Sequence, residues 1–154
     1  MEDNKKTSYD STVDTMLHIK RVAQLLTGAA AELIRRANVH DQSKLESPEK
    51  EYFDEYTPLL KDLIYVSDEY KEVFKKLKVG VDHHYDHNSH HPEYYKNGIN
   101  GFDLFDLVEM FFDWKAATER SKDGDLLKSI KINHDRFEMC DQLVDILNNT
   151  AKRL

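Results

Sequence analysis

Apolar residues recur at every third or fourth position from about Ser11 to Val39, near the start of this chain. The residues on this stripe are Met16, Ile19, Ala23, Leu26, Ala30, Leu33 and Ala37. Such spacing places them on one face of an α-helix. A second apolar row, formed by Val22, Leu25 and Ala29, lies on another face. We therefore expect this helix at the centre of the fold or at a subunit contact, which leaves a homodimer open.

The rest of the chain also favours helices, because 5 glycines and 3 prolines in 154 residues leave few interruptions. We expect helices from Ser47 to a break at Thr57-Pro58, from Ser67 to about Asn88, over residues 102–121, and in one or two segments over 125–151. Loops are expected at Pro92, at Asn97-Gly98 and at an Asp123-Gly124 turn. The predicted fold class is all-α, a compact multi-helix bundle that forms a single domain over residues 1–154, with residues 1–10 disordered.

Composition and charge limit the class of protein. Hydrophobic residues make up 40% and charged residues 33% of the chain, which is typical of a folded globular protein. The net charge of -7 argues against an extended nucleic-acid-binding surface. No long apolar run or signal-peptide pattern occurs, so we expect no membrane association and a cytoplasmic protein. The single Cys140 argues for a reducing compartment and against a cysteine-based zinc site.

Histidine is concentrated in one short segment. Five of the 8 histidines lie in the run His83-His84-Tyr85-Asp86-His87-Asn88-Ser89-His90-His91. A sixth, in His40-Asp41, falls on the next step of the first helix's apolar stripe, which points it toward the core. Histidine is the commonest metal ligand. A mixed nitrogen and oxygen donor set suits one or two divalent transition metal ions (Mn, Fe, Co, Ni or Zn) better than Ca²⁺ or Mg²⁺.

One ion cannot bind all five clustered histidines. We prefer His84 and His91 as ligands, with His83 and His90 as supporting or surface groups, and the choice within each pair stays open. A solvated polar helix end is the alternative interpretation of this segment. His18 precedes His40 by 22 residues, so one straight helix would separate them by about 33 Å and exclude a shared metal.

Acidic residues form a narrow stripe on the predicted helix over residues 102–121. The stripe contains Asp106, Glu109, Asp113 and Arg120. Taken alone, it is an exposed face of an amphipathic helix. Beside the histidines, Asp106 would be a metal ligand, Glu109 or Asp113 would orient a histidine or act as a base, and a cation would have to offset the carboxylates.

Two resemblances follow from these motifs. The order of the histidines and aspartates along the chain resembles the ligand order of the HD superfamily. The residues in this order are His18, His40-Asp41, His84, His91 and Asp106, and Lys44 follows the His-Asp pair closely. This resemblance implies an HD-like helical fold and hydrolysis of phosphate esters, including nucleotides, with a smaller branch that uses two irons and dioxygen. Nearly the whole chain is also similar to an uncharacterised family that occurs in phages and bacteria. The segments that carry this similarity include Asp68-Glu69-Tyr70-Lys71, His90-His91-Pro92-Glu93, Asp113-Trp114-Lys115-Ala116 and Arg136-Phe137. The similarity suggests a phage protein, and a phage-encoded member would reside in the host cytoplasm.

The leading hypothesis is a metal-dependent phosphohydrolase that acts on a small phosphorylated substrate, with a nucleotide favoured. The expected metal ligands are His40, Asp41, His84, His91 and Asp106. Glu109 is the expected base, and Lys44 with Arg120 would neutralise charge in the transition state. No organic cofactor is expected. The alternatives are an HD-type diiron oxygenase and a non-catalytic phage accessory protein with a structural metal site or none.

Overall fold

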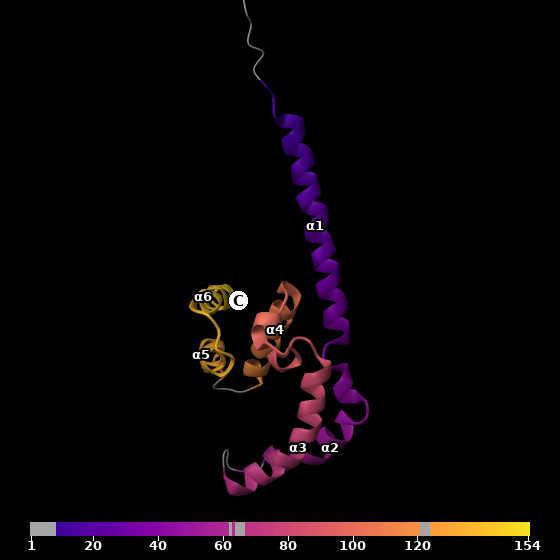
Figure 1. The fold of residues 1–154 in the computed structure, drawn as a ribbon, viewed down its shortest axis with the longest axis vertical. Coiled ribbons are helices and arrows are strands. Elements are labelled where there is room, and N and C mark those ends of the chain that lie inside the picture. Colours follow the sequence, from indigo (N-terminus) through magenta and orange to yellow (C-terminus); the bar gives the residue numbers. More distant parts are fainter. Residues whose placement is uncertain (1–8, 62, 64–66, 121–123) are drawn as a thin grey trace, which may run out of the picture. The chain divides into compact units, whose positions relative to one another are not determined.

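The computed structural model describes residues 9–61, 63, 67–120 and 124–154. Within these ranges the chain forms six α-helices and three short 3-10 helices, and no β-strand (Figure 1). The all-α prediction is therefore confirmed. The chain divides into two units, residues 1–38 and 39–154, which are described separately below. The expected single domain stays a prediction.

The first unit consists of one helix, α1 (Thr12–Val39), which continues to the unit boundary. The helix begins and ends as the apolar stripe predicts. Asp14 in its first turn and Arg36 in its last turn complement the helix dipole. No residue of α1 is buried. Among the residues of this unit that the structure describes, no second helix or strand packs against the apolar side chains of α1. The expected disorder of residues 1–10 falls largely on residues 1–8, which lie outside the described part.

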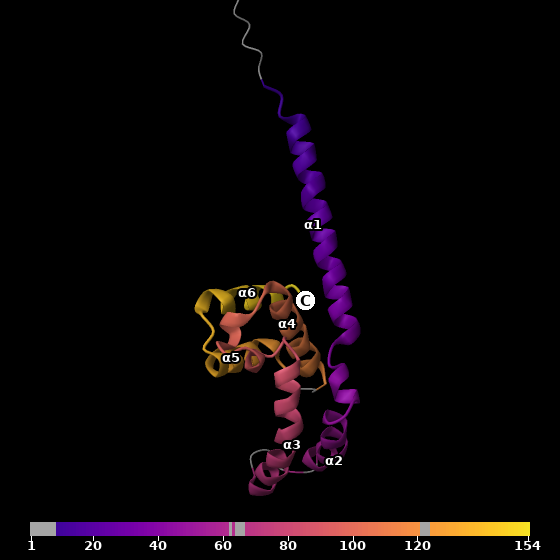
Figure 2. The same ribbon diagram turned by 45° about the vertical axis from the view of Figure 1, so that its right-hand side comes forward.

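In the second unit, α2 (Glu49–Lys61) packs against α3 (Asp68–His87), and Figures 1 and 2 show the two helices side by side. Ser67 caps α3 as predicted, because its side chain accepts a hydrogen bond from the backbone N–H of Tyr70. The helices approach closely at Gly80, where an added Cβ would lie 2.7 Å from Cβ of Tyr52. This close packing brings the first turn of α2 to the histidine-rich end of α3.

The predicted break at Thr57-Pro58 is wrong, because α2 continues through Pro58 to Lys61. Proline lacks the N–H that would bond to the carbonyl four residues earlier, at Asp54. Both residues are exposed, so water can serve that carbonyl. The proline also lies near the end of the helix, where few hydrogen bonds depend on it.

The remaining helices are α4 (Leu104–Glu119), α5 (Leu126–Phe137) and α6 (Asp141–Ala151), which lie close together in Figure 2 and contribute to an apolar core. Phe111, Ile130, Met139 and Leu147 form its buried centre. The two helices over 126–151 match one of the two predicted arrangements. The expected Asp123-Gly124 turn and the expected end of α4 at residue 121 fall partly outside the described residues.

Three 3-10 helices connect these elements: η1 (Gln42–Leu45), η2 (Pro92–Tyr94) and η3 (Gly98–Gly101). The last two occupy the positions where loops were predicted. Among the helices that the structure describes, none combines the length and the apolar character that a membrane span requires.

Candidate metal centre

His40 and Asp41 lie at the turn between α1 and η1. Asp41 adopts the left-handed backbone region with φ of 58°, which asparagine and aspartate tolerate better than most residues. This turn brings the Asp41 carboxylate to His84 of α3, and His40 to Glu109 of α4. The second unit thus assembles side chains from η1, α3 and α4 in one place.

Four of these side chains form a group of candidate metal donors. Asp41, His84, His90 and His91 each offer one ligand atom, and the four atoms lie within 4.8 Å of one another. Nε2 of His84 lies 3.0 Å from Nε2 of His91 and 3.2 Å from Oδ1 of Asp41. Nε2 of His90 lies 3.4 Å from the same Asp41 oxygen. His90, set aside in the sequence analysis, joins the group together with His91.

These distances match the geometry of a bound ion. A tetrahedral ion with bonds of about 2.0–2.1 Å to its ligands holds neighbouring donor atoms about 3.3 Å apart. The three separations given above all lie within a few tenths of an ångström of that value. Three of the six donor–donor separations therefore suit a first-row divalent metal, and all six lie within 4.8 Å.

Two atoms of this group are buried without a hydrogen-bond partner. They are Oδ1 of Asp41 and Nε2 of His90, for which the described residues supply no bond of acceptable geometry. Leaving a buried polar atom unpaired costs on the order of 1–3 kcal/mol. A cation between these two atoms would satisfy both, because each can offer it a lone pair.

Glu49, at the start of α2, fixes the orientation of His84. Its side chain is 0% exposed, and Oε2 accepts a hydrogen bond from Nδ1 of His84 at 2.9 Å. Oε1 accepts one from Nδ1 of His83 at 2.9 Å, and the hydroxyl of Ser43 donates to Oε2 at 2.9 Å. Because a carboxylate only accepts, the Nδ1 of His84 carries the proton and its Nε2 is left with a lone pair that faces the donor group.

The pKa directions agree with this proton assignment. Burial opposes ionisation of Glu49, but hydrogen bonds from His83 and Ser43 outweigh it and lower the pKa of this carboxyl. Burial, followed by the neighbouring charges of His90 and His84, lowers the pKa of His91 to about 3. His91 is therefore a neutral imidazole near neutral pH, which is the form that binds metal.

A second group of donors adjoins the first and shares Asp41 with it. Nε2 of His40 lies 3.7 Å from Oδ2 of Asp41 and 3.7 Å from Oδ1 of Asp113. Asp41 thus presents one carboxylate oxygen to each group. Nζ of Lys44 lies 2.6 Å from the same Oδ2 and supplies a positive charge there. Burial acts to raise the pKa of Asp41, but the neighbouring side chains of His84, His90 and Lys44 prevail and lower it strongly.

Glu109 connects histidines of both groups. Its Oε1 lies 2.9 Å from Nδ1 of His40 and 3.3 Å from Nδ1 of His90. The neighbouring carboxylates of Asp113 and then Glu109 raise the pKa of His40 to about 10, against the opposing effect of burial. Two members of the acidic stripe of α4, Glu109 and Asp113, therefore face the histidines.

Asp106 is placed differently from the expectation that it is a metal ligand. None of the donor groups found among the described residues contains it. Its carboxylate accepts hydrogen bonds from the hydroxyls of Ser89 and Tyr95, each at 2.7 Å, and from the backbone N–H of Asp103 at 3.2 Å. Asp106 is the fourth residue of a capping box that starts α4, so its carboxylate is directed back to the helix start. These hydrogen bonds join the histidine segment to the start of α4, and the role of Asp106 as a metal ligand stays a prediction.

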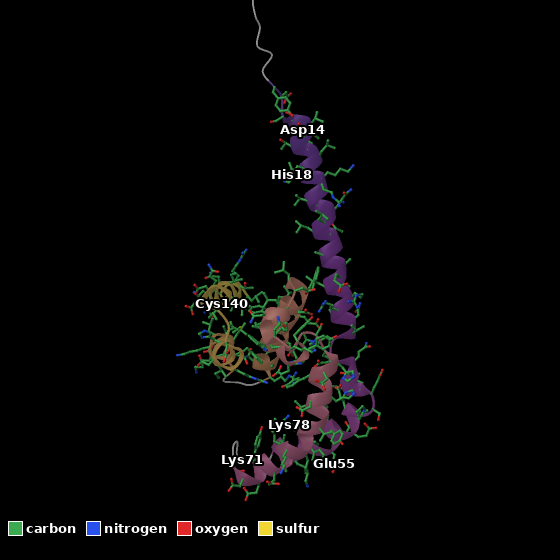
Figure 3. The ribbon with its side chains drawn as sticks, in the orientation of Figure 1. Asp14, His18, Glu55, Lys71, Lys78 and Cys140 are labelled. Carbon is green, nitrogen blue, oxygen red and sulfur yellow. The ribbon has the colours of Figure 1, made fainter. Side chains whose placement is uncertain are left out.

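The other predicted site residues fall into two sets. Lys44 lies at the centre, beside Asp41. Arg120 does not: it is exposed and follows Asp113 by seven residues, about 10 Å along the helix axis. His18 projects from α1 in the first unit (Figure 3), and no donor group of the described residues includes it.

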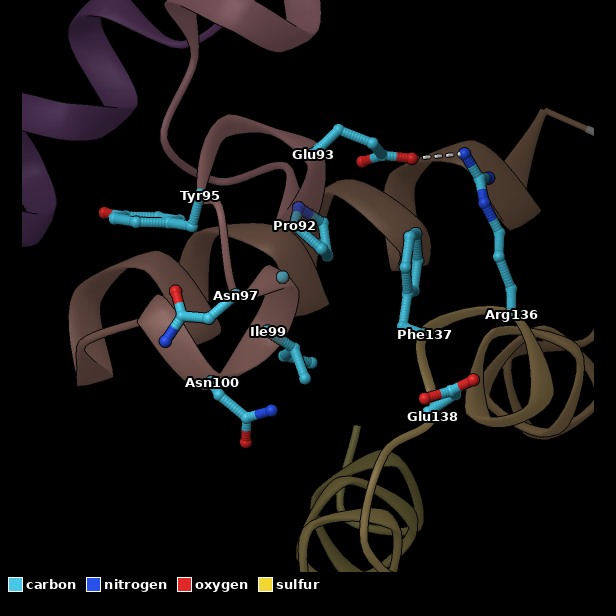
Figure 4. Close-up of a pocket in the computed structure, with 10 residues that line it drawn as sticks. Pro92, Glu93, Tyr95, Asn97, Ile99, Asn100, Arg136, Phe137 and Glu138 are labelled. Carbon is cyan, nitrogen blue, oxygen red and sulfur yellow. Dashed lines mark hydrogen bonds and ion pairs between the residues drawn. The ribbon is translucent and has the colours of Figure 1, made fainter.

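A pocket of about 360 Å³ begins immediately after the histidine segment, at Pro92 (Figure 4). Its rim carries an ion pair of 2.6 Å between Arg136 and Glu93. Arg136 also donates to the hydroxyl of Tyr85 at 3.5 Å, and the ring of Tyr85 contacts the ring of His91, with centroids 4.6 Å apart. The pocket is therefore linked to the donor group through one aromatic side chain.

The fold and this site define an all-α protein with a candidate metal centre of histidines and carboxylates. The chain belongs to a family of unknown function, DUF5662, whose model matches residues 7–153. This match confirms the resemblance to an uncharacterised domain family, and the link to the HD superfamily stays a prediction. Comparisons with curated proteins and with solved structures yielded no match.

Proposed function

We propose that the second unit binds one or two divalent transition metal ions and hydrolyses a small phosphorylated substrate, with a nucleotide as the leading candidate. The observation that carries this proposal is the pair of buried, unpartnered atoms, Oδ1 of Asp41 and Nε2 of His90, at the meeting point of two further imidazole nitrogens. The order of the histidines and aspartates along the chain, which resembles that of HD phosphohydrolases, supports the reaction class.

The coordination number bears on whether the site is catalytic. Asp41, His84, His90 and His91 would fill the four positions of a tetrahedral ion, which is typical of a structural zinc site. An octahedral ion such as Mn²⁺, Fe²⁺ or Co²⁺ would keep two positions for water and substrate. We therefore expect hydrolysis with these ions and a stabilising but inactive complex with Zn²⁺.

A bound ion would supply a Lewis acid that acidifies water and withdraws charge from a phosphoryl oxygen. The protein's own groups have separate tasks around it. Glu49 and Glu109 hold the rings of His84 and His90 in one orientation. We expect Lys44, which forms an ion pair with Asp41, to bind a phosphoryl oxygen. Asp113 exposes more of its side chain than Glu109 does (22% against 13%), so we assign proton acceptance to Asp113 rather than to Glu109.

The test uses the full chain without a histidine tag, because a tag would bind the same metals. The protein is loaded separately with Mn²⁺, Fe²⁺, Co²⁺ and Zn²⁺ and assayed for hydrolysis of p-nitrophenyl phosphate, bis-p-nitrophenyl phosphate and nucleoside mono-, di- and triphosphates. The proposal expects turnover with an octahedral ion that His84→Ala abolishes. The control His87→Ala, at an exposed histidine three residues along α3, should retain it. Metal binding without turnover of any substrate would favour the non-catalytic alternative.

One observation also favours the diiron oxygenase as a second candidate. Asp41 directs its two oxygens to two adjacent donor groups, as a carboxylate that bridges two irons would. The described donors contain no sulfur, which fits iron in an oxygen-activating site. Protein loaded with Fe²⁺ under nitrogen would then consume dioxygen in the presence of substrate. Turnover that is independent of dioxygen and supported by Mn²⁺ would exclude this candidate.

A further inference from the structure

We propose that α1 pairs with the α1 helix of a second copy of this chain, in antiparallel orientation. The proposal concerns the first unit alone and does not depend on the metal centre. The first unit consists of a single long helix whose apolar side chains stay exposed: Met16 is 64%, Ile19 61% and Leu26 65% exposed. An exposed apolar stripe of this length marks an interaction surface.

The spacing of the stripe is that of a coiled coil. The positions 16, 19, 23, 26, 30, 33 and 37 alternate steps of three and four without exception, which is the a and d pattern of a heptad repeat. Large and small side chains alternate along it, since Ile19, Leu26 and Leu33 are interleaved with Ala23, Ala30 and Ala37. A stripe with this alternation packs best against a partner helix that sets a small side chain opposite a large one.

Antiparallel pairing supplies that order. An alignment in which Ala23 of one copy faces Leu26 of the second copy also sets Ile19 against Ala30, and Met16 against Leu33. None of these layers then contains two alanines: Leu26 and Ile19 each meet an alanine, and Met16 meets Leu33. A parallel, in-register pair would instead place each alanine against its own copy and leave voids between layers of Leu and Ile.

Charge favours the same orientation. The N-terminal turn of α1 carries Asp14, and the C-terminal turns carry Arg35 and Arg36, of which Glu32 offsets one charge. In an antiparallel pair the two helix dipoles are opposed, which is the favourable arrangement, whereas Asp14 and Arg35 lie on the same side of α1 as Arg21, away from the contact. In a parallel pair, the two basic ends would lie beside each other and repel.

The area is sufficient for a stable dimer. Besides the seven stripe positions, Val22, Ala29 and Ile34 flank the contact. We take for each of these side chains the area that its transfer free energy implies, so that each helix would bury roughly 700 Å² in the dimer. The pair would bury about 1,400 Å², which lies within the range of specific protein–protein interfaces. The occupant that fits in length, dipole orientation and packing is thus a second α1.

The test combines mass and crosslinking on the full chain, in a Cys140→Ser background because Cys140 is exposed. Light scattering after size exclusion should give a dimer. Leu26→Glu should give a monomer, whereas Arg21→Glu, on the opposite side of α1, should leave the dimer intact. Under mild oxidation, Met16→Cys combined with Leu33→Cys should form a covalent dimer, and each single variant should stay uncrosslinked.

Each other outcome overturns the proposal. A monomeric wild-type chain would mean that something else covers the stripe of α1, for example the same chain's second unit. Crosslinking of Met16→Cys or Leu33→Cys alone would indicate a parallel pair. Gly28→Cys, which faces away from the contact in this alignment, is the control for random collision and should not crosslink.

Discussion

Replacing Glu49 by glutamine should weaken metal binding without removing any metal ligand. Glu49 is completely buried and none of the candidate donor groups contains it. Its contact with the centre passes through the hydrogen bond from Nδ1 of His84. Glutamine keeps the size of the side chain and one accepting oxygen, but it loses the negative charge and presents an NH₂ group to Ser43 or His83.

The expected size of the effect follows from these contacts. A hydrogen bond to a charged acceptor contributes about 1.5–3 kcal/mol, against about 0.5–1.5 for a neutral one, so the exchange should cost roughly 1–2 kcal/mol. That is about a 5- to 30-fold weaker affinity, at about 1.4 kcal/mol per factor of ten. Glu49→Ala should cost more, because it leaves His83, His84 and Ser43 without their shared acceptor. Losses of 10- to 100-fold are typical when such supporting carboxylates are changed.

The assay is competition between the protein and a calibrated chelator for Co²⁺, read by the visible absorption of the bound ion. Glu51→Gln, at an exposed position of the same helix turn, is the matched control and should bind like the wild type. Apo-protein melting curves verify that each variant folds. If Glu49→Gln binds Co²⁺ as tightly as Glu51→Gln while both fold, Glu49 does not orient a metal-binding histidine and the account of the site fails.

Three further substitutions separate ligand, structural and substrate-binding roles. His90→Ala should lower metal affinity about 100-fold or more while His87→Ala does not, measured by the same competition assay; equal affinities would remove His90 from the centre. Asp106→Ala should lower the free energy of unfolding by about 2–4 kcal/mol in urea titrations, because Ser89, Tyr95 and the N–H of Asp103 lose their acceptor. The metal content of this variant should not change, and metal loss in a folded variant would indicate that Asp106 is a ligand. Lys44→Met should reduce kcat about 100-fold at unchanged metal content, and an unchanged kcat would show that Lys44 does not act on the phosphoryl group.

The sequence predicted those elements whose signals are local and periodic. The stripe of α1 and the Ser67 cap of α3 each depend on a few neighbouring residues, and the structure contains both. The Thr57-Pro58 break failed because the cost of a proline depends on whether its orphaned carbonyl can reach water. Solvent access at one helix turn is a property of the tertiary arrangement, which periodicity does not report.

The candidate site could be predicted in kind but not in detail. Residue type indicated histidines with carboxylates, yet Glu49 looked like an ordinary acidic residue in the first turn of a helix. Only the close approach of α2 and α3 at Gly80 brings it to His83 and His84. Asp106 was grouped with Glu109 and Asp113 because the three share a helix face. The capping box that turns Asp106 back was the available signal, since Asp103 precedes it by three residues.

Metal analysis of the full, untagged chain tests most directly whether the histidines and Asp41 bind a metal ion; it uses inductively coupled plasma mass spectrometry after loading with each first-row divalent ion and exhaustive dialysis. We expect at least one tightly bound equivalent per chain in the wild type, retained in His87→Ala and lost in the double variant His84→Ala with His90→Ala. A wild-type chain that retains no more metal than this double variant, for every ion tested, would contradict this expectation.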